Sequence, residues 1–248
     1  MSGHSKWSTI KRQKGITDNK RGQLFTKLAR EITVAARSGV PDLDANARLR
    51  IAVEKARKEN MPKDNIDRAI ERGKGAAGGE NYDEIAYEGF GPGGIAFIIQ
   101  AMTDNRNRTV GEVRAAMTRG GGNLGADGSV SWMFDNVGLI VVNPGKHDED
   151  EIAMIAIDAG ATEFESDEDT MIVYTEPQDL HKVSEQLTAS GLEIESAELS
   201  MKPKDPIIPE ADLAVKVIRL VERLEDLDDV QTVYTNLEIS DDVLAQVS

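Results

Sequence analysis

One stretch decides how this chain is organised: Gly73-Lys74-Gly75-Ala76-Ala77-Gly78-Gly79. Four of its residues are glycine and none has a large apolar side chain, so it offers little for a core to pack against. Glycine-rich segments of this kind behave as flexible linkers. The stretch therefore predicts a domain boundary, with one domain over residues 1–79 and a different kind of structure after it.

The segment before this linker has the pattern of three short helices. Apolar residues recur at three- and four-residue steps up to a stop at Gly39, which is typical of an amphipathic helix. A second helix is expected to start at Asp42 or Asp44, and Pro62 fits the first turn of a third. We expect a basic arm followed by a small bundle, whose first helix packs through Leu24, Phe25, Leu28, Ile32 and Ala35.

After the linker the apolar pattern changes from helix to strand. Residues 85–88 and 95–102 are expected to form a hairpin joined by the glycine-rich loop 89–94, and residues 110–120 a helix. A further strand is expected over residues 129–134.

Residues 138–201 then follow the order β-α-β-β-α-β, which is the split βαβ or ferredoxin-like arrangement. The last helix and strand, around 213–224 and 230–237, cannot bury themselves alone, so we expect them to return to the sheet begun at Ile85. The predicted fold class is α+β with several domains. It comprises a three-helix bundle (1–79), a discontinuous middle α/β domain (80–134 plus 206–248) and an inserted ferredoxin-like βαββαβ domain (135–205).

Composition and motifs argue against an enzyme. The 248 residues include no cysteine and three histidines, which excludes a disulfide framework, a zinc ribbon and a cysteine nucleophile. The G-x-G-x-x-G match that begins at Gly89 contains Pro92 and leads into a strand, whereas dinucleotide binding needs a helix N-terminus. The acids Asp226, Asp228 and Asp229 suit a solvated helix end and need no metal. We expect no catalytic residues, no cofactor and no metal.

Neither a membrane span nor a signal peptide is expected. The longest apolar run near the middle, Ile95–Ile99, is too short to cross a bilayer, and the N-terminus carries charges instead of an apolar segment. We expect a cytoplasmic protein.

The formal net charge of −15 hides a division along the chain. Residues 1–75 carry 18 Lys and Arg against 9 Asp and Glu, a net charge of +9, whereas residues 76–248 carry 11 against 35, a net charge of −24. Asymmetry of this size indicates a basic binding segment on an acidic body.

The basic residues are concentrated at the start of the chain, where a tryptophan lies among them. Cationic side chains neutralise phosphates and an indole ring can stack on a base, so we interpret this segment as a nucleic-acid-binding arm. An ordinary solvated tail is the alternative. The candidate contacts are Lys6, Trp7, Lys11, Arg12, Lys14, Lys20 and Arg21.

A second basic cluster follows the hairpin, between Asp104 and Gly125. Four of the 11 basic residues after residue 75 lie there, and both arginine forks and glycine N–H groups suit phosphate. The alternative is a structural turn in which Asp104 and Asn105 cap the helix and pair with the arginines, and the sequence leaves both open. The candidate contacts are Arg106, Asn107, Arg108 and Arg119.

The expected ferredoxin-like domain is strongly acidic. Residues 132–205 hold 18 acids against 4 basic residues, and their strands offer only Tyr174 for base stacking. Because such a surface repels phosphate, we expect a scaffold or a protein-contact domain there.

Four stretches carry the most specific patterns: Gly3-His4-Ser5-Lys6-Trp7, Asn60-Met61-Pro62-Lys63-Asp64-Asn65-Ile66, Thr103-Asp104-Asn105-Arg106-Asn107-Arg108-Thr109, and Gly121-Gly122-Asn123-Leu124-Gly125 with Gly128-Ser129-Val130. Together they resemble the YebC/PmpR family, whose eukaryotic relatives are mitochondrial translational activators. The resemblance covers essentially the whole chain. It implies a three-domain fold and a non-enzymatic regulator of gene expression. Some members have been assigned as DNA-binding transcriptional regulators, and others as ribosome-associated translation factors that relieve stalling.

We therefore expect a nucleic-acid-binding regulator, in the first place a DNA-binding transcriptional regulator. The alternative is a translation factor associated with the ribosome or rRNA. The expected partners are DNA, or rRNA and the ribosome, together with a protein bound through the acidic domain, and no membrane.

Overall fold

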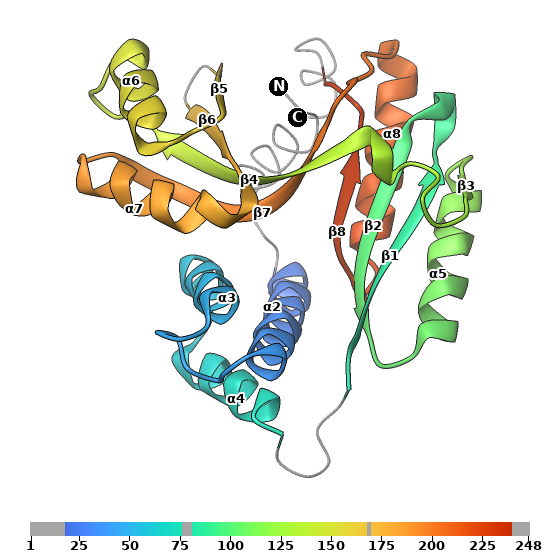
Figure 1. Cartoon of the computed structure of the whole chain (residues 1–248). Coiled ribbons are helices and arrows are strands. Elements are labelled where there is room, and N and C mark those ends of the chain that lie inside the picture. The colour runs from blue at the N-terminus through green and yellow to red at the C-terminus, as the bar shows by residue number, and fades with distance from the viewer. Residues whose placement is uncertain (1–17, 76–80, 168–169, 240–248) are drawn as a thin grey trace. The chain divides into compact units, whose positions relative to one another are not determined.

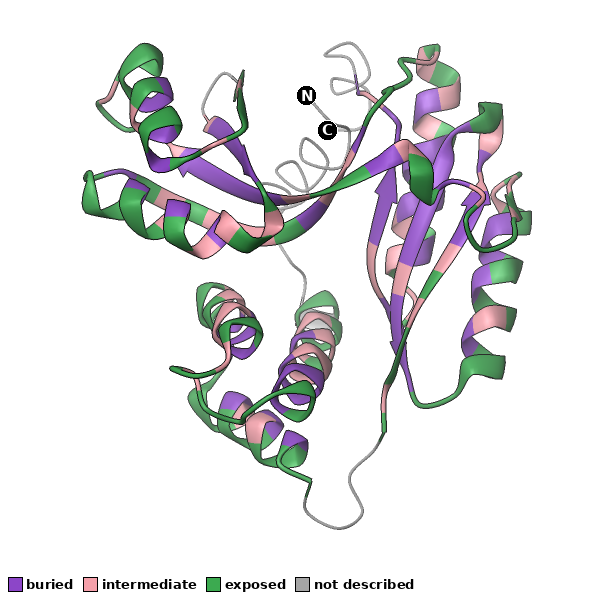
Figure 2. Ribbon diagram, in the orientation of Figure 1, coloured by how far each residue is buried: buried purple, intermediate pink, exposed green. Residues whose placement is uncertain are grey.

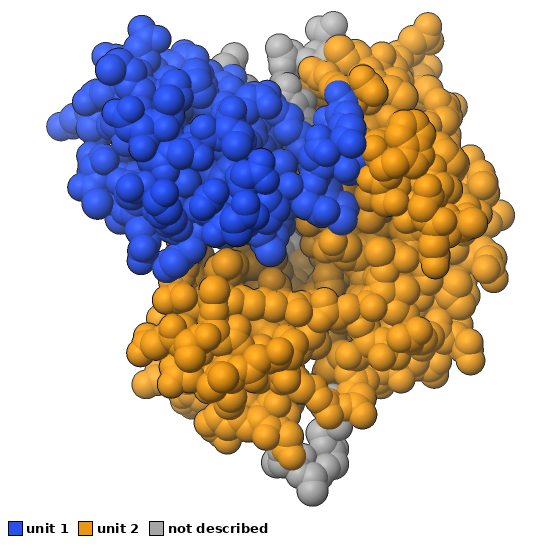
Figure 3. Space-filling model, in the orientation of Figure 1, with its two compact units in different colours: residues 1, 134–204 blue, residues 2–133, 205–248 orange. Residues whose placement is uncertain are grey.

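The structure is a computed structural model, and it describes residues 18–75, 81–167 and 170–239. Within these residues it contains seven α-helices and two four-stranded antiparallel sheets, so the mixed α and β character predicted from the sequence is confirmed. The chain divides into two compact units, residues 134–204 and residues 2–133 with 205–248 (Figures 1 and 3). The division into three domains stays a prediction, and most of the expected linker, residues 76–79, lies outside the described residues.

Helices α2 (Asp18–Ser38), α3 (Ala47–Lys58) and α4 (Lys63–Gly73) pack around one apolar cluster. The spacing that predicted α2 is the spacing of its buried side chains, because Leu28, Ile32 and Ala35 are all buried in this cluster. Figure 2 shows the buried residues of these helices on the sides that face one another.

Helix α3 begins later than the sequence predicted. Its N-cap is Asn46, whose Oδ1 accepts a hydrogen bond from the Leu49 N–H at 3.0 Å, so the expected start at Asp42 or Asp44 is wrong. The Asn46 amide also donates to two backbone carbonyl groups, one in α2 and one in the turn after it. Asp42 instead accepts a hydrogen bond from the Asp44 N–H at 2.8 Å. An aspartate inside the turn therefore orders the turn, and the asparagine at its end caps the helix.

The first sheet has the strand order β3-β1-β2-β8. Strands β1 (Asp83–Phe90) and β2 (Ala96–Thr103) form the expected hairpin through a short 3-10 turn at Pro92–Gly94, and β3 (Asn123–Leu124) pairs with β1. Helices α5 (Arg106–Arg119) and α8 (Ala211–Glu225) share one core with the alternating residues Ile95, Phe97 and Ile99. Strand β8 (Val230–Thr235) pairs with β2, which confirms the expected return of the chain to this sheet.

The strand expected over residues 129–134 is wrong. Ser131–Met133 forms a 3-10 turn, and the strand begins only at Phe134. The carboxylate of Glu88 explains the difference, because it accepts hydrogen bonds from the N–H groups of Val130 and Ser131 at 2.7 and 2.9 Å. These two N–H groups are therefore not available to donate hydrogen bonds to a neighbouring strand.

The unit of residues 134–204 runs in the order β4 (Phe134–Asn143), α6 (Glu149–Ala159), β5 (Glu163–Asp167), β6 (Thr170–Thr175), α7 (Leu180–Ala189) and β7 (Glu193–Pro203). This is the β-α-β-β-α-β order, and the strands lie in the order β5-β6-β4-β7. The ring of Tyr174 is buried in this unit, with the Lys202 ammonium 4.0 Å from its centroid. That ring is therefore not available for stacking on a base.

Candidate nucleic-acid interface

Five of the candidate contacts in the basic arm lie outside the described residues: Lys6, Trp7, Lys11, Arg12 and Lys14. The last two members of that set, Lys20 and Arg21, lie in the first turn of α2 and are exposed. The Lys20 ammonium is 3.9 Å from Oδ1 of Asp226, and both side chains are more than half exposed. Exposed pairs at this distance contribute little, so the pair leaves Lys20 accessible to another anion.

The second candidate cluster lies where β2 ends and α5 begins. Asn105 is the N-cap of α5, and its Oδ1 accepts a hydrogen bond from the Arg108 N–H at 3.1 Å. The Thr103 hydroxyl accepts from the Asn105 N–H at 2.8 Å, and the Asp104 carboxylate lies 2.7 Å from Nη2 of Arg108. Part of this motif is therefore the structural turn that the sequence left open.

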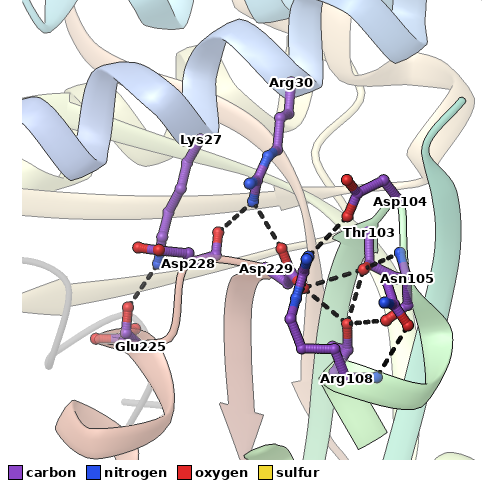
Figure 4. A network of polar contacts seen from close by, with 10 residues as sticks. Lys27, Arg30, Thr103, Asp104, Asn105, Arg108, Glu225, Asp228 and Asp229 are labelled. Atoms are coloured by element: carbon purple, nitrogen blue, oxygen red, sulfur yellow. Dashed lines mark hydrogen bonds and ion pairs between the residues drawn. The ribbon is translucent and has the colours of Figure 1, made fainter. Parts of the chain in front are cut away.

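The centre of the cluster is a carboxylate that the sequence placed in solvent. Asp229 lies in the turn before β8 with its side chain 2 % exposed, so the expectation of a solvated helix end is wrong for this residue (Figure 4). Its Oδ2 accepts hydrogen bonds from the hydroxyls of Thr103 and Thr109 at 3.0 and 2.7 Å, and from Nη2 of Arg108 at 2.7 Å. Burial raises the pKa of Asp229, but these hydrogen bonds outweigh it and hold the pKa below its ordinary value.

Helix α2 contacts this region through two basic side chains, one at the turn before β8 and one at the end of α8 (Figure 4). Nη1 of Arg30 lies 3.1 Å from Oδ1 of Asp229 and donates to the Asp228 carbonyl, and the Lys27 ammonium donates to the Glu225 carbonyl. The Arg30 side chain is only 15 % exposed. These two cations of the basic segment therefore attach α2 to the end of α8 and to the turn before β8.

Arg106 differs from Arg108 although the two are close together at the start of α5. Its Nε donates to Oδ2 of Asp83 at 2.7 Å, but the two side chains are 66 % and 51 % exposed. The hydrogen bond from Arg106 holds the pKa of Asp83 below its ordinary value. Asn107 and Arg119 are also exposed on α5. All four candidates in this cluster are therefore exposed, but Arg108, with its side chain 42 % exposed, is held between two carboxylates.

Backbone N–H groups of the glycine-rich loop already donate hydrogen bonds to acceptors within the protein. The Glu88 carboxylate accepts hydrogen bonds from the N–H groups of Gly128, Val130 and Ser131 at 2.7 to 2.9 Å. Burial raises the pKa of Glu88, but the three hydrogen bonds outweigh it, and its pKa lies below the ordinary value. The N–H groups of the earlier glycines also donate to carbonyl groups: Gly120, Gly121, Gly122 and Gly125. The interpretation of these glycines as phosphate ligands is not supported by this arrangement.

Sequence comparison assigns the whole chain to one family. Residues 5–76 match the family profile for the TACO1/YebC protein N-terminal domain, and residues 82–237 match that for the TACO1/YebC second and third domain. The chain belongs to the TACO1/YebC family. The resemblance drawn from the four sequence stretches is therefore confirmed.

Two relatives in this family carry the name "Probable transcriptional regulatory protein". The protein of Roseiflexus castenholzii is 53% identical and the match covers 99% of this chain and 98% of the relative. That of Herpetosiphon aurantiacus is 54% identical, with 98% and 97% covered. The crystal structure of a conserved hypothetical protein from Aquifex aeolicus is 47% identical, covers 92% of this chain and 94% of that chain, and superimposes with a TM-score of 0.84.

For this TACO1/YebC protein, sequence reasoning missed Asp229, Arg30 and Glu88 as organising residues. The first two lie far apart in the sequence, and no local pattern joins them.

Among the described residues, no helix is long and apolar enough to cross a membrane. No group of three or more His, Asp or Glu in that part of the chain is placed to hold a metal ion.

Proposed function

We propose that this TACO1/YebC protein is a non-enzymatic regulator of gene expression that binds nucleic acid through its phosphate backbone. The contacts are made by the basic arm, by the start of α2 and by the exposed side of α5. DNA is the proposed target, in a cytoplasmic transcriptional regulator. The names of the relatives from Roseiflexus castenholzii and Herpetosiphon aurantiacus support this choice.

The observation that carries the proposal is the division of the arginines around the start of α5. Arg30 and Arg108 both reach the buried carboxylate of Asp229, although Arg108 is itself 42 % exposed, whereas Arg106 and Arg119 are exposed and lie outside this network. A cluster that served only the fold would not need cations on its outer side. Exposed guanidinium groups on a helix that also presents Asn107 are suited to phosphate oxygens.

The acidic unit of residues 134–204 takes a different role in the proposal. Its charge repels phosphate, so it does not contact nucleic acid but offers a surface for a protein. The proposed domain division follows the sequence: residues 1–79, residues 80–134 with 206–248, and residues 135–205.

The target is tested by sedimenting lysate with and without nuclease, followed by cross-linking to nucleic acid. Recovery of DNA cross-links supports the proposal. Recovery mainly with ribosomes and rRNA overturns the transcriptional assignment in favour of a translation factor.

The contact residues are tested by two charge reversals measured on the same DNA duplex. One variant carries Lys11→Glu with Arg12→Glu, and the other carries Arg106→Glu with Arg119→Glu. The matched control is Lys146→Glu with Lys182→Glu, which makes the same change in charge within the acidic unit. We expect both test variants to bind more weakly than the control. Unchanged affinity in both refutes the proposed contacts.

A further inference from the structure

The basic residues after residue 75 are not spread evenly over the structure. Seven of the 11 lie on two helices, α5 and α8, which contact one another and share one core. The remaining four lie in the unit of residues 134–204. The members on α5 are Arg106, Arg108, Arg114 and Arg119, and those on α8 are Lys216, Arg219 and Arg223.

The three cations of α8 lie on the side of the helix away from its core. None of Lys216, Arg219 and Arg223 is buried, and their spacing of three and four residues places them on one side of the helix. The opposite side is buried through Val217, Val221 and other residues of the shared core. The cations therefore form a continuous stripe, about 10.5 Å long from first to last at 1.5 Å per residue.

The end of α5 packs against α8. A Cβ atom at Gly120, the residue after α5, would lie only 2.6 Å from Cδ1 of Leu220. Leu220 is four residues after Lys216 and three before Arg223, so it lies one helical turn from each. Arg119 directly precedes Gly120 and is the exposed last residue of α5. We call Arg119, Lys216, Arg219 and Arg223 the α5–α8 basic surface.

These four cations are not neutralised by the neighbouring acids. Within the described residues no carboxylate lies within 4.0 Å of any of them, although α8 itself carries Asp212, Glu222 and Glu225. Elsewhere in residues 76–248 some exposed cations have a carboxylate partner, since Lys204 is 3.2 Å from Asp135 and Arg106 is 2.7 Å from Asp83. Among the described residues Arg114, Lys146 and Lys182 also have no carboxylate within 4.0 Å, but they are not grouped on one side of one helix. Three cations on one side of one helix, without carboxylate partners in this acidic part of the chain, point to an anionic ligand.

We propose that the α5–α8 basic surface binds the phosphate backbone of a nucleic acid, as a contact region additional to the basic arm and to Arg106. This inference rests on the proposed function and extends it to α8. Each strand of duplex DNA presents one negative charge per about 3.4 Å of axis, so the stripe spans about three phosphates of one strand. Arginine forks bind phosphate oxygens in pairs, which suits Arg219 and Arg223.

The test compares two double variants that each remove two positive charges. Arg219→Gln with Arg223→Gln removes two cations from the α5–α8 basic surface, and Lys146→Gln with Lys182→Gln removes two cations from the acidic unit. Dissociation constants are measured between 50 and 200 mM salt on a duplex DNA and on a structured RNA of equal length. Glutamine has nearly the helix propensity of arginine, so the fold of α8 is expected to persist.

We expect the slope of log affinity against log salt to become shallower by about 1.8 on duplex DNA, at about 0.9 for each phosphate that the variant no longer neutralises. Raising the salt from 50 to 200 mM should therefore weaken the binding of the variant by a factor about 12 times smaller than the factor for the wild type. The control variant keeps the wild-type slope. A change on DNA alone, or on RNA alone, supports the surface and identifies its ligand.

The failure of this inference is distinguishable from failure of the proposed function. A wild-type protein with no salt-dependent binding overturns both. A wild-type protein with a steep slope, and an α8 variant identical to the control, overturns the α5–α8 surface alone. If the α8 variant unfolds at a lower temperature than the control, Arg219→Lys with Arg223→Lys keeps the charge and must restore the wild-type slope.

Discussion

Nη2 of Arg108 lies 2.7 Å from Oδ2 of Asp229, across 121 residues of sequence. The same guanidinium reaches Asp104 at 2.7 Å, so it connects the start of α5 to the turn before β8. Arg30 approaches the other oxygen of Asp229 from α2. One buried carboxylate therefore holds three segments together, and it engages Arg30 and Arg108 while Arg106 and Arg119 lie outside this network.

Replacing Asp229 is expected to destabilise the protein. Asp229→Asn keeps the size of the side chain but removes the charge that pairs with Arg108 and Arg30. The groups that donate hydrogen bonds to Oδ2 then lose a charged acceptor. Hydrogen bonds to charged groups are worth about 1.5–3 kcal/mol, so we expect a decrease of that order in the free energy of unfolding, measured with denaturant. The control is Asp228→Asn, whose side chain is not buried and should change little. Equal effects in the two variants would contradict the central role of Asp229.

Arg106 and Arg108 are expected to separate binding from stability. Arg106→Gln removes an exposed side chain, so it should weaken binding to DNA while the unfolding temperature stays near the wild-type value. Arg108→Gln should lower the unfolding temperature clearly, because it removes the hydrogen bonds to Asp229. Fluorescence anisotropy with DNA and thermal unfolding on the same samples measure both quantities. The opposite ranking would show that the exposed arginine is structural.

The stability due to Glu88 is expected to depend on pH. Because its pKa is lower in the folded protein than in the unfolded chain, where it is about 4.3, its carboxylate stabilises the fold above that pH. This contribution disappears as the pH falls through the lower, folded pKa. Glu88→Gln should therefore cost about 1–3 kcal/mol at pH 7, and the difference from wild type should shrink from about pH 5 to about pH 3. The control is Glu112→Gln, at an exposed position on α5. A difference that stays constant with pH would argue against the hydrogen-bonded carboxylate.

Two glycines in open surroundings are expected to respond in opposite directions to alanine. No atom lies within 4 Å of a Cβ built at Gly111 or at Gly128, so neither substitution causes a clash. Gly111 lies inside α5, where alanine should stabilise the protein by about 0.5–1 kcal/mol. Gly128 has φ +82° and donates to Glu88, and alanine there should cost about 1–2 kcal/mol. Thermal unfolding of both variants checks this, and stabilisation by Gly128→Ala would contradict the backbone assignment.

Local patterns in the sequence predicted most of the helices and strands. The three- and four-residue spacing of Leu28, Ile32 and Ala35 matched burial in the bundle, and the β1–β2 hairpin was evident from its glycine-rich loop. The predictions that proved wrong concern segments that contact side chains far away in the sequence. Residues 129–134 were expected to form a strand, but Glu88, at least 40 residues earlier, accepts the hydrogen bonds of that segment. Asp229 belongs to an acidic run that was expected to be solvated, but its side chain is buried where it contacts α5.

The sequence predicted which motifs belong to the candidate site, but not how their side chains are arranged in space. The motif around Arg106 and Arg108 was identified, but its sequence does not say which arginine faces a buried carboxylate. The spacing of Lys216, Arg219 and Arg223 is visible in the sequence, where acids are interspersed with them. That the end of α5 meets α8 depends on the packing of Gly120 against Leu220, which no periodicity reveals.

The salt dependence of DNA binding by the full-length chain tests the central claim most directly. If the basic arm, the start of α2 and α5 neutralise roughly six phosphates, log affinity against log salt should fall with a slope near about −5 on duplex DNA. Arg106→Glu with Arg119→Glu should make that slope shallower, while Lys146→Glu with Lys182→Glu should leave it unchanged. A flat salt response of the wild-type protein would contradict the claim that this chain binds the phosphate backbone.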